Sequence, residues 1–305
     1  MLLEWMSREL LVAPTLIKEI ASSASHRYRT FTISGRRSGQ KTVHHPARQL
    51  KALQRWLLRR VVVLLPVHDA AVAYRKGLSI VANGRRHVDS RFLLRMDFEE
   101  FFPSLTGADV KRTLSKAKNA GRLPAEWSDD DTYLFARLVC RHDRLTIGAP
   151  TSPGLCNAIC FDLDEQLTAL AGRYDATYTR YADDLFFSSG QSDVMKLIEC
   201  EVKRVIRGLC HPEGIRLNNA KTRHSSMRGR RLVTGIVLTP QHGISLGRKM
   251  KRYLRSQVFK LDNLTGEERR RLRGWLSYSR SVEPDFLNRL MLKFGAAQVN
   301  KARSP

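Results

Sequence analysis

A short predicted hairpin with two adjacent acids at its tip constrains this chain most. Residues 177–188 are Thr-Tyr-Thr-Arg-Tyr-Ala-Asp-Asp-Leu-Phe-Phe-Ser, so β-forming residues lead into Asp183 and Asp184 and an apolar strand leads away. Successive strand residues face opposite ways, so only one of these carboxylates can point squarely at a shared ligand while its neighbour turns partly aside. The pattern predicts a β-hairpin with a functional carboxylate in its turn.

A second predicted strand ends in another carboxylate. Residues 91–97 are Arg-Phe-Leu-Leu-Arg-Met-Asp, an apolar strand that finishes at Asp97. Asp97, Asp183 and Asp184 are hard oxygen ligands, and the backbone carbonyl of Phe98 is expected to add another. This set suits two Mg²⁺ ions that drive an in-line phosphoryl displacement.

The charge of the chain points to a polyanionic partner. Its 305 residues contain 53 Lys and Arg but only 29 Asp and Glu, which gives a net charge of +24. The basic residues recur along the whole chain, so we expect nucleic acid as the partner rather than a merely soluble basic protein. The length leaves room for two or three subdomains around a sizeable core.

The sequence gives no sign of a disulfide framework, a zinc site or a membrane anchor. The five cysteines are odd in number and form no CxxC pair, so they are predicted to be reduced, buried thiols. The apolar run at 59–66 is too short to cross a membrane, and the first residues lack the pattern of a secretory signal. We therefore expect a cytoplasmic protein with no membrane partner.

Hydrophobic periodicity predicts a mixed order of helices and strands. One helix is expected over 154–171 and one strand over 231–238, directly before a basic helical region that starts at 247. The other expected elements are helices up to about residue 25, two strands within 28–45, and helices at 46–58, 109–120, 130–141 and 193–209.

Taken in order, six blocks of sequence resemble the retron reverse transcriptases of bacteria. They are the basic segment 36–46, Asn83-Gly-Arg-Arg-His87 with the following Asp97 strand, residues 148–157, Tyr181 to Asp184, residues 218–222, and Val233-Thr234-Gly235. The resemblance implies an α+β fold, a right-hand polymerase with fingers, palm and helical thumb. Its implied domains are fingers at 1–90 with 111–145 inserted, palm at 91–110 and 146–239, and a thumb and RNA-binding region at 240–305.

Two positions depart from the pattern of this family. Gly84 stands where retron enzymes usually have alanine, and Ile147 occupies a position that is often glutamine in other reverse transcriptases. Neither position is a predicted metal ligand, so the expected activity stands.

The resemblance assigns roles to individual residues. Asp97, Asp183 and Asp184 are the implied catalytic carboxylates, and Phe102 the ring beneath the deoxyribose, unless it is a core aromatic like Phe101. The implied nucleotide-binding residues are Arg36, Arg37, Lys41, Phe102, Ser152 and Lys221, although the basic ones also fit a solvated surface and Ser152 a helix start. The implied nucleic-acid-binding residues are Asn83, His87, Asn157, Val233, Thr234, Gly235, Arg248, Lys251, Arg252, Arg255, Arg269 and Arg273. His87 fits a core histidine equally well.

The same resemblance implies an RNA-directed DNA polymerase that uses Mg²⁺ and dNTPs. It would copy a structured noncoding RNA into single-stranded DNA that stays linked to that RNA, and act with an effector protein in antiphage defence. Two alternatives remain open. One is another bacterial reverse transcriptase, diversity-generating or CRISPR-associated, and the other is a ribonucleoprotein scaffold that restrains an effector.

Overall fold

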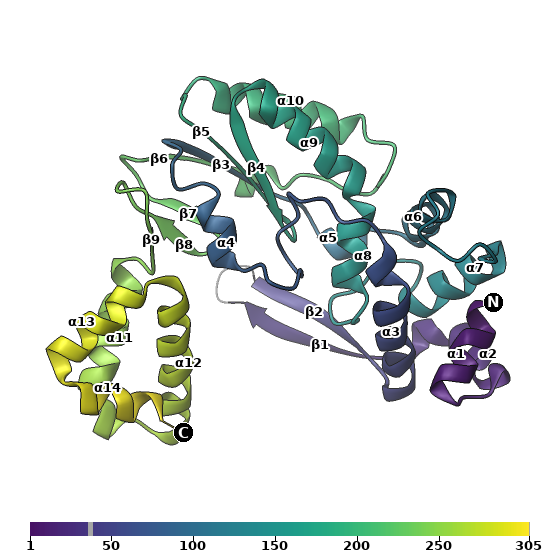
Figure 1. The fold of residues 1–305 in the computed structure, drawn as a ribbon, viewed down its shortest axis with the longest axis horizontal. Coiled ribbons are helices and arrows are strands. Elements are labelled where there is room, and N and C mark those ends of the chain that lie inside the picture. The colour runs from purple at the N-terminus through teal and green to yellow at the C-terminus, as the bar shows by residue number, and fades with distance from the viewer. Residues whose placement is uncertain (36–38, 305) are drawn as a thin grey trace.

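A computed structural model describes residues 1–35 and 39–304 of the chain (Figure 1). Its α-helices are α1 Leu2–Leu10, α2 Pro14–Ser22, α3 Arg48–Arg60, α4 Ile80–Arg85, α5 Phe101–Ser104, α6 Gly107–Asn119, α7 Asp129–Val139, α8 Ser152–Ile159, α9 Phe161–Arg173, α10 Val194–Arg207, α11 Arg248–Phe259, α12 Gly266–Val282, α13 Pro284–Phe294 and α14 Ala296–Arg303. Its strands are β1 Tyr28–Gly35, β2 Gly39–Pro46, β3 Phe92–Asp97, β4 Ala176–Tyr181, β5 Asp184–Ser189, β6 Arg223–Ser226, β7 Arg231–Val233, β8 Ile236–Leu238 and β9 Ile244–Ser245.

The central sheet has the order β4-β5-β3-β6, and each neighbouring pair is antiparallel. Both faces of this sheet are covered. Leu94 and Phe187 belong to the large core with α9 and α10, whereas Leu93 and Phe186 pack on the other face against Val233 and its neighbours. Because side chains alternate along a strand, burial on both faces explains the nearly continuous apolar runs of β3 and β5.

A second core lies in the C-terminal helices α11–α14, which form a separate lobe at the lower left of Figure 1. Leu254, Leu276 and Phe286 are buried at its centre. Ile236 of β8 joins this core, and Ile80 of α4 packs against its edge. The small sheet β7-β8-β9 and α4 therefore connect the lobe to the central sheet.

The β1–β2 hairpin crosses beneath the central sheet in Figure 1 and meets the loop before α8. The N–H of His44 donates to the carbonyl of Ile147 at 2.8 Å. Gly148 follows with φ of +110°, and a Cβ there would lie 2.7 Å from the His44 carbonyl oxygen. Glycine is required at this position because both the backbone angle and the close approach exclude a side chain.

Three expectations from the sequence were wrong. The helix expected over 154–171 is two helices, because Cys160, with ψ of 8°, ends α8. The strand expected over 231–238 is a hairpin that turns at Thr234 and Gly235. Cys140, Cys156 and Cys160 are buried as predicted, but Cys200 and Cys210 are exposed; all five are free thiols.

No helix among the described residues is both long and apolar enough to cross a membrane.

Candidate active site

Three carboxylates lie together where β3 ends and β5 begins. Asp97 is directly opposite Asp184 in the register of the two strands, and its side chain is nearly buried. The N–H of Phe98 donates to the carbonyl oxygen of Asp183 at 3.0 Å, which holds the turn between β4 and β5 against the end of β3. The structure thus brings the predicted carboxylates Asp97, Asp183 and Asp184 to one edge of the sheet.

Two of the three carboxylates are bound to cations of the protein itself. Lys221 Nζ donates to Asp97 Oδ1 at 2.7 Å, and Arg95 binds Asp184 Oδ1 through Nε and Nη2 at 2.9 and 2.7 Å. Burial raises the pKa of Asp184 to about 6, although its ion pair with Arg95 acts in the opposite direction. Asp184 lies opposite Asp97 in the strand register, so both side chains share one face of the sheet with Arg95, two residues before Asp97.

The donor chemistry at this edge suits a divalent cation. Carboxylate and carbonyl oxygens are the ligands that Mg²⁺ prefers. Within residues 1–35 and 39–304, no group of three or more Asp, Glu, His or Cys side chains is already arranged to hold a metal ion. The ammonium of Lys221 and the guanidinium of Arg95 instead supply the positive charge beside these acids.

The two aromatic residues after Asp97 differ in burial. Phe101 is buried and stacks on Phe98, with ring centroids 5.4 Å apart, so it is a core residue as predicted. Phe102 is half-buried, and its ring centroid lies 6.4 Å from that of Tyr74, which is largely exposed. Phe102 therefore lies at the surface of the core, and sequence reasoning missed Tyr74 as its neighbour.

The predicted nucleotide contacts have different outcomes. Arg36 and Arg37 lie outside the described residues, and Lys41 is exposed on β2. Ser152 contradicts its prediction, because it is fully buried and its Oγ accepts the N–H of Thr146 at 3.3 Å. Ser152 is the first residue of α8, which agrees with the alternative prediction that this serine starts a helix.

Asn157 also contradicts its predicted nucleic-acid contact. Its side chain is buried, and Nδ2 donates to the carbonyl of Ala73 at 2.8 Å. This bond ties α8 to the segment that follows α3, so the asparagine has a structural role.

Asn83 and His87 were predicted to contact nucleic acid, but both are wholly buried. The Thr179 hydroxyl donates to Asn83 Oδ1 at 2.7 Å, so it must accept from His87 Nε2, which lies 2.7 Å away. His87 Nδ1 then accepts from the Ser188 hydroxyl, also at 2.7 Å. This chain of hydrogen bonds connects α4, β4 and β5, and it explains the two residue types by structure rather than by RNA binding.

The Val233-Thr234-Gly235 triplet is a tight turn. Thr234 and Gly235 have φ of 48° and 86°, as a two-residue hairpin turn requires. Val233 is buried in the core beneath the turn, which contradicts its predicted contact with nucleic acid. Only Thr234 and Gly235 reach the surface.

The predicted basic residues of the C-terminal lobe fall into two groups. Arg248 and Arg252 are exposed on α11. The others have partners within the protein: Lys251 binds Glu283 at 2.6 Å, Arg255 lies over the ring of Phe286, Arg269 donates to the Leu264 and Asp262 carbonyls, and Arg273 donates to the Ser304 carbonyl.

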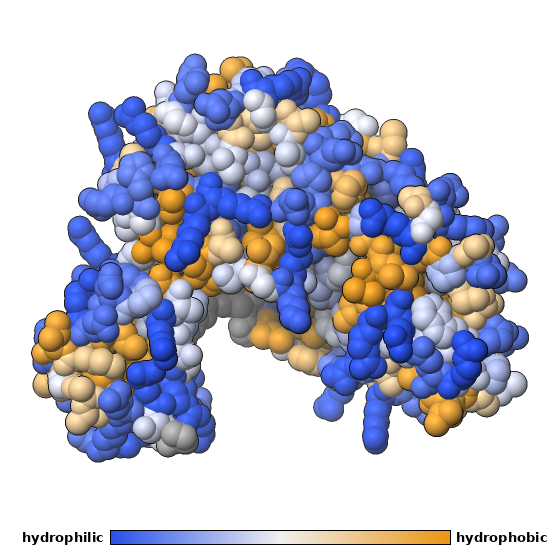
Figure 2. All heavy atoms as spheres, in the orientation of Figure 1, coloured by the Kyte–Doolittle hydropathy of each residue, from blue (hydrophilic) through white to orange (hydrophobic). Residues whose placement is uncertain are grey.

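The exposed pair borders a groove of about 1150 Å³ between β8 and the start of α11. We call it the basic groove. Tyr253 also lines it, together with Arg228 and Arg230, which sequence reasoning missed. In Figure 2 both hydrophilic and hydrophobic side chains border the large hollow between the C-terminal lobe and the rest of the molecule. Clustered cations with one aromatic residue are typical of surfaces that bind nucleic acid.

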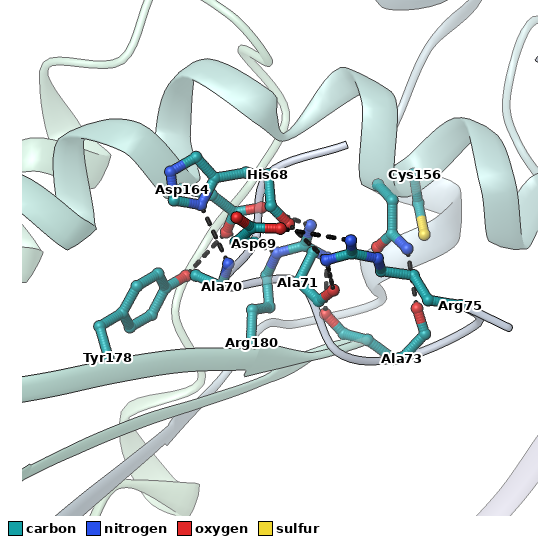
Figure 3. Close-up of polar contacts among 12 residues, drawn as sticks. His68, Asp69, Ala70, Ala71, Ala73, Arg75, Cys156, Asp164, Tyr178 and Arg180 are labelled. Carbon is teal, nitrogen blue, oxygen red and sulfur yellow. Dashed lines mark hydrogen bonds and ion pairs between the residues drawn. The ribbon is translucent and has the colours of Figure 1, made fainter. Parts of the chain in front are cut away.

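A buried ion pair behind the turn was also missed. Arg180 of β4 binds Asp164 of α9, and both side chains are fully buried (Figure 3). The available signal was an arginine in the middle of a strand that the sequence predicts to be buried.

Comparison with known proteins gives a consistent set of relatives. No protein-family model matches the chain. The retron Ec86 reverse transcriptase of Escherichia coli is 30% identical over 308 residues, which cover 98% of this chain and 92% of the relative. The retron Ec83 reverse transcriptase of Escherichia coli is 31% identical, covering 93% and 92%. The retron Mx65 reverse transcriptase of Myxococcus xanthus is 35% identical, covering 86% and 63%.

Solved structures give weaker matches. A foamy viral protease-reverse transcriptase bound to double-stranded DNA has a TM-score of 0.49 and 14% identity, covering 91% of this chain and 44% of that one. Telomerase from Candida albicans has a TM-score of 0.48 and 12% identity, covering 95% and 65%.

Proposed function

Because the chain belongs to the retron reverse transcriptases and is therefore an RNA-directed DNA polymerase, we propose that it copies a structured noncoding RNA into single-stranded DNA that stays linked to that RNA. The fold is the α+β right-hand polymerase fold. The observation that carries the proposal is the juxtaposition of Asp97, Asp183 and Asp184 at one sheet edge. The division into fingers, palm and thumb at the predicted residues, and a cytoplasmic location, belong to the same proposal.

In this proposal the carboxylates of Asp97 and Asp183 and the carbonyl of Phe98 would hold two Mg²⁺ ions, with Asp184 assisting from the side. When bound, the ions supply activation of the primer hydroxyl and neutralise the charge of the triphosphate. Arg95 fixes the orientation of Asp184 beside them. Lys221, now bound to Asp97, carries a proton within reach of the site and can neutralise the departing pyrophosphate.

Phe102 is proposed as the residue that selects deoxynucleotides. Its ring is half-buried five positions after Asp97, between the core and Tyr74. A 2′-hydroxyl would collide with a ring held beneath the sugar, so Phe102→Ala should admit ribonucleotides. Unchanged discrimination between rNTPs and dNTPs in the folded variant would show that Phe102 is an ordinary core aromatic residue.

The basic groove is proposed to hold the noncoding RNA. Arg228, Arg230, Arg248 and Arg252 line it and can neutralise phosphates, while Tyr253 offers a face for base stacking. Thr234 and Gly235 are proposed to contribute at the surface of the nearby turn.

Sequencing the DNA that co-purifies with the protein tests the proposal. A short, unique DNA covalently joined to RNA is expected from the wild type and not from Asp183→Asn. DNA of diverse sequence would instead indicate a diversity-generating or CRISPR-associated enzyme. Full biological activity of an Asp183→Asn protein loaded with pre-made RNA–DNA would favour the scaffold role. An effector protein and a part in antiphage defence are proposed on family grounds alone.

A further inference from the structure

The turn that carries Asp183 is held from behind by an ion pair. Arg180 Nε and Nη2 bind the two carboxylate oxygens of Asp164 at 2.8 and 2.6 Å, and the Tyr178 hydroxyl donates to Asp164 Oδ1 at 2.8 Å (Figure 3). Both charged side chains are fully buried. Removing two charges from water is costly, and apolar residues of similar volume often give equal or better stability. Stability alone therefore does not account for this pair.

One donor of Arg180 reaches the catalytic turn itself. Nη1 donates to the carbonyl oxygen of Ala182 at 3.3 Å. Ala182 has φ of +56°, a left-handed conformation that costs a non-glycine residue about 1 kcal/mol or more. A fixed donor on its carbonyl helps to hold this conformation.

This bond and one other fix the peptide planes on both sides of Asp183. The plane before Asp183 contains the Ala182 carbonyl, which Arg180 holds, and the plane after it contains the Asp183 carbonyl, which the N–H of Phe98 holds at 3.0 Å. Peptide units are rigid, so holding both planes fixes φ and ψ of Asp183. Only side-chain torsions then remain to be set for its carboxylate.

The backbone of Arg180 is also held in place. Its main-chain N–H donates to the Ala70 carbonyl at 2.8 Å, and the Val72 N–H donates to its carbonyl at 2.9 Å. The ring of Phe101, which stacks on Phe98, lies 5.9 Å from the guanidinium carbon. Arg180 thus binds the carbonyl before Asp183 directly, and it lies beside the ring that packs on Phe98, whose N–H holds the carbonyl of Asp183.

We propose that Arg180, oriented by Asp164, is a positioning residue that sets the backbone of Asp183 for catalysis. The proposal rests on the catalytic role proposed for Asp183. Misplacement of a reacting group by about 1 Å can cost roughly a hundredfold in rate, so loss of this bond should reduce turnover before it affects substrate binding.

Arg180→Lys is the first test, because lysine keeps the charge beside Asp164 but loses the fork that also reaches Ala182. We expect a folded protein that binds RNA as the wild type does, with kcat reduced about tenfold or more and KM for dNTPs within about twofold. Two readouts do not depend on turnover. Binding of Mn²⁺, measured by electron paramagnetic resonance, should weaken several-fold, and hydrogen exchange at the Phe98 amide should become faster.

A second variant removes the whole network. Arg180→Met, Asp164→Leu and Tyr178→Phe together remove both buried charges and the hydroxyl, and leave the Ala182 carbonyl without its Arg180 donor. This protein should therefore fold and still show the loss in kcat. The matched control is Asp109→Asn, which disrupts the buried pair between Asp109 of α6 and His211, which follows α10. We expect it to lose stability but not kcat.

Several results would overturn the proposal. They are wild-type kcat and Mn²⁺ affinity in either folded variant, an equal loss of kcat in Asp109→Asn, or failure of both Arg180 variants to fold, which would assign the pair to folding. Asp183→Asn is assayed in parallel. Full activity of that variant would refute the catalytic role of Asp183 independently of Arg180.

Discussion

Around the central sheet, cations lie against acids: Lys221 binds Asp97, Arg95 binds Asp184, and Arg180 binds Asp164. On α11, by contrast, Arg248 and Arg252 are exposed at the rim of the basic groove. Paired charges in a partly dry environment fix geometry, and their attraction is screened little by salt. Exposed cations instead keep their charge for a polyanion, and salt weakens them strongly. Arginine and lysine therefore fix the positions of acidic side chains around the central sheet, whereas in the basic groove they are available to attract a polyanion.

The largest expected effect is a loss of DNA synthesis on mutation of the carboxylates, which distinguishes the central sheet from the basic groove. Asp97→Asn and Asp183→Asn should each reduce DNA synthesis by about a thousandfold or more, because each removes charge from the proposed metal site. RNA affinity, measured by filter binding, should stay unchanged. Normal primer extension by both purified variants would contradict the assignment of the site.

Charge reversal in the groove should instead weaken RNA binding and have much less effect on DNA synthesis. Changing Arg248 and Arg252 together to Glu should weaken RNA binding roughly 10- to 100-fold at low salt and reduce the slope of log affinity against log salt by about 1.5 to 2. Extension of a generic primer–template at saturating concentration should fall much less. Arg8→Glu with Lys18→Glu, exposed positions of α1 and α2, is the control. A slope identical to that of the wild type would show that the RNA is held elsewhere.

A pH test distinguishes the buried network from the groove. Burial lowers the pKa of His87 from 6.5 to about 3, so the fold favours the neutral ring. Its contribution to stability is complete above about pH 6.5 and is lost as pH falls toward 3, about 2 kcal/mol by pH 5. Arginine and lysine side chains ordinarily titrate far above this range, so the test reports on the buried histidine.

His87→Gln should remove this part of the pH dependence, because the amide can donate and accept without titrating. The measurement is the free energy of unfolding at pH 5 and 7.5, with exposed His45→Gln as the control. An unaltered pH dependence in His87→Gln would show that other groups govern acid stability.

The smallest expected effect is at Gly84, between the two regions. A Cβ there would meet Ile244, Ile236 and Leu238 at 3.6 to 3.8 Å, which is ordinary contact. Gly84→Ala should therefore stabilise α4 by about 0.5–1 kcal/mol and raise Tm by a degree or two. Gly235→Ala, at φ of 86°, should lower Tm instead. A lower Tm for Gly84→Ala would mean that α4 cannot accept the methyl group.

The sequence predicted that Asp97 and Asp183 lie close together because the signals for this are local. Asp97 and Asp183 each end or follow a strand whose apolar pattern is unambiguous, so their meeting follows from pairing of those strands. Asn83 and His87 show the limit. Their partners Thr179 and Ser188 lie about a hundred residues away, so sequence spacing could not show that both side chains are used internally.

The charged residues show the same limit for a different reason. Composition predicts a basic surface, but Lys251 and Arg252 are neighbours in sequence, and only the fold places Glu283 against the first. The turn at Thr234 and Gly235 carried a local signal, a glycine within a short apolar run, that the interpretation as a recognition triplet obscured.

The contact at Gly148 has a consequence for how this enzyme can vary. The loop before α8 and the β1–β2 hairpin approach so closely that a single methyl group at residue 148 would overlap the His44 carbonyl. In a saturation library scored for activity, position 148 should accept glycine alone, whereas Gly84 should accept alanine. The contact between the β1–β2 hairpin and the loop before α8 therefore tolerates no substitution at residue 148. Substitutions that adapt the enzyme to new substrates have to occur at other positions of the hairpin or the loop.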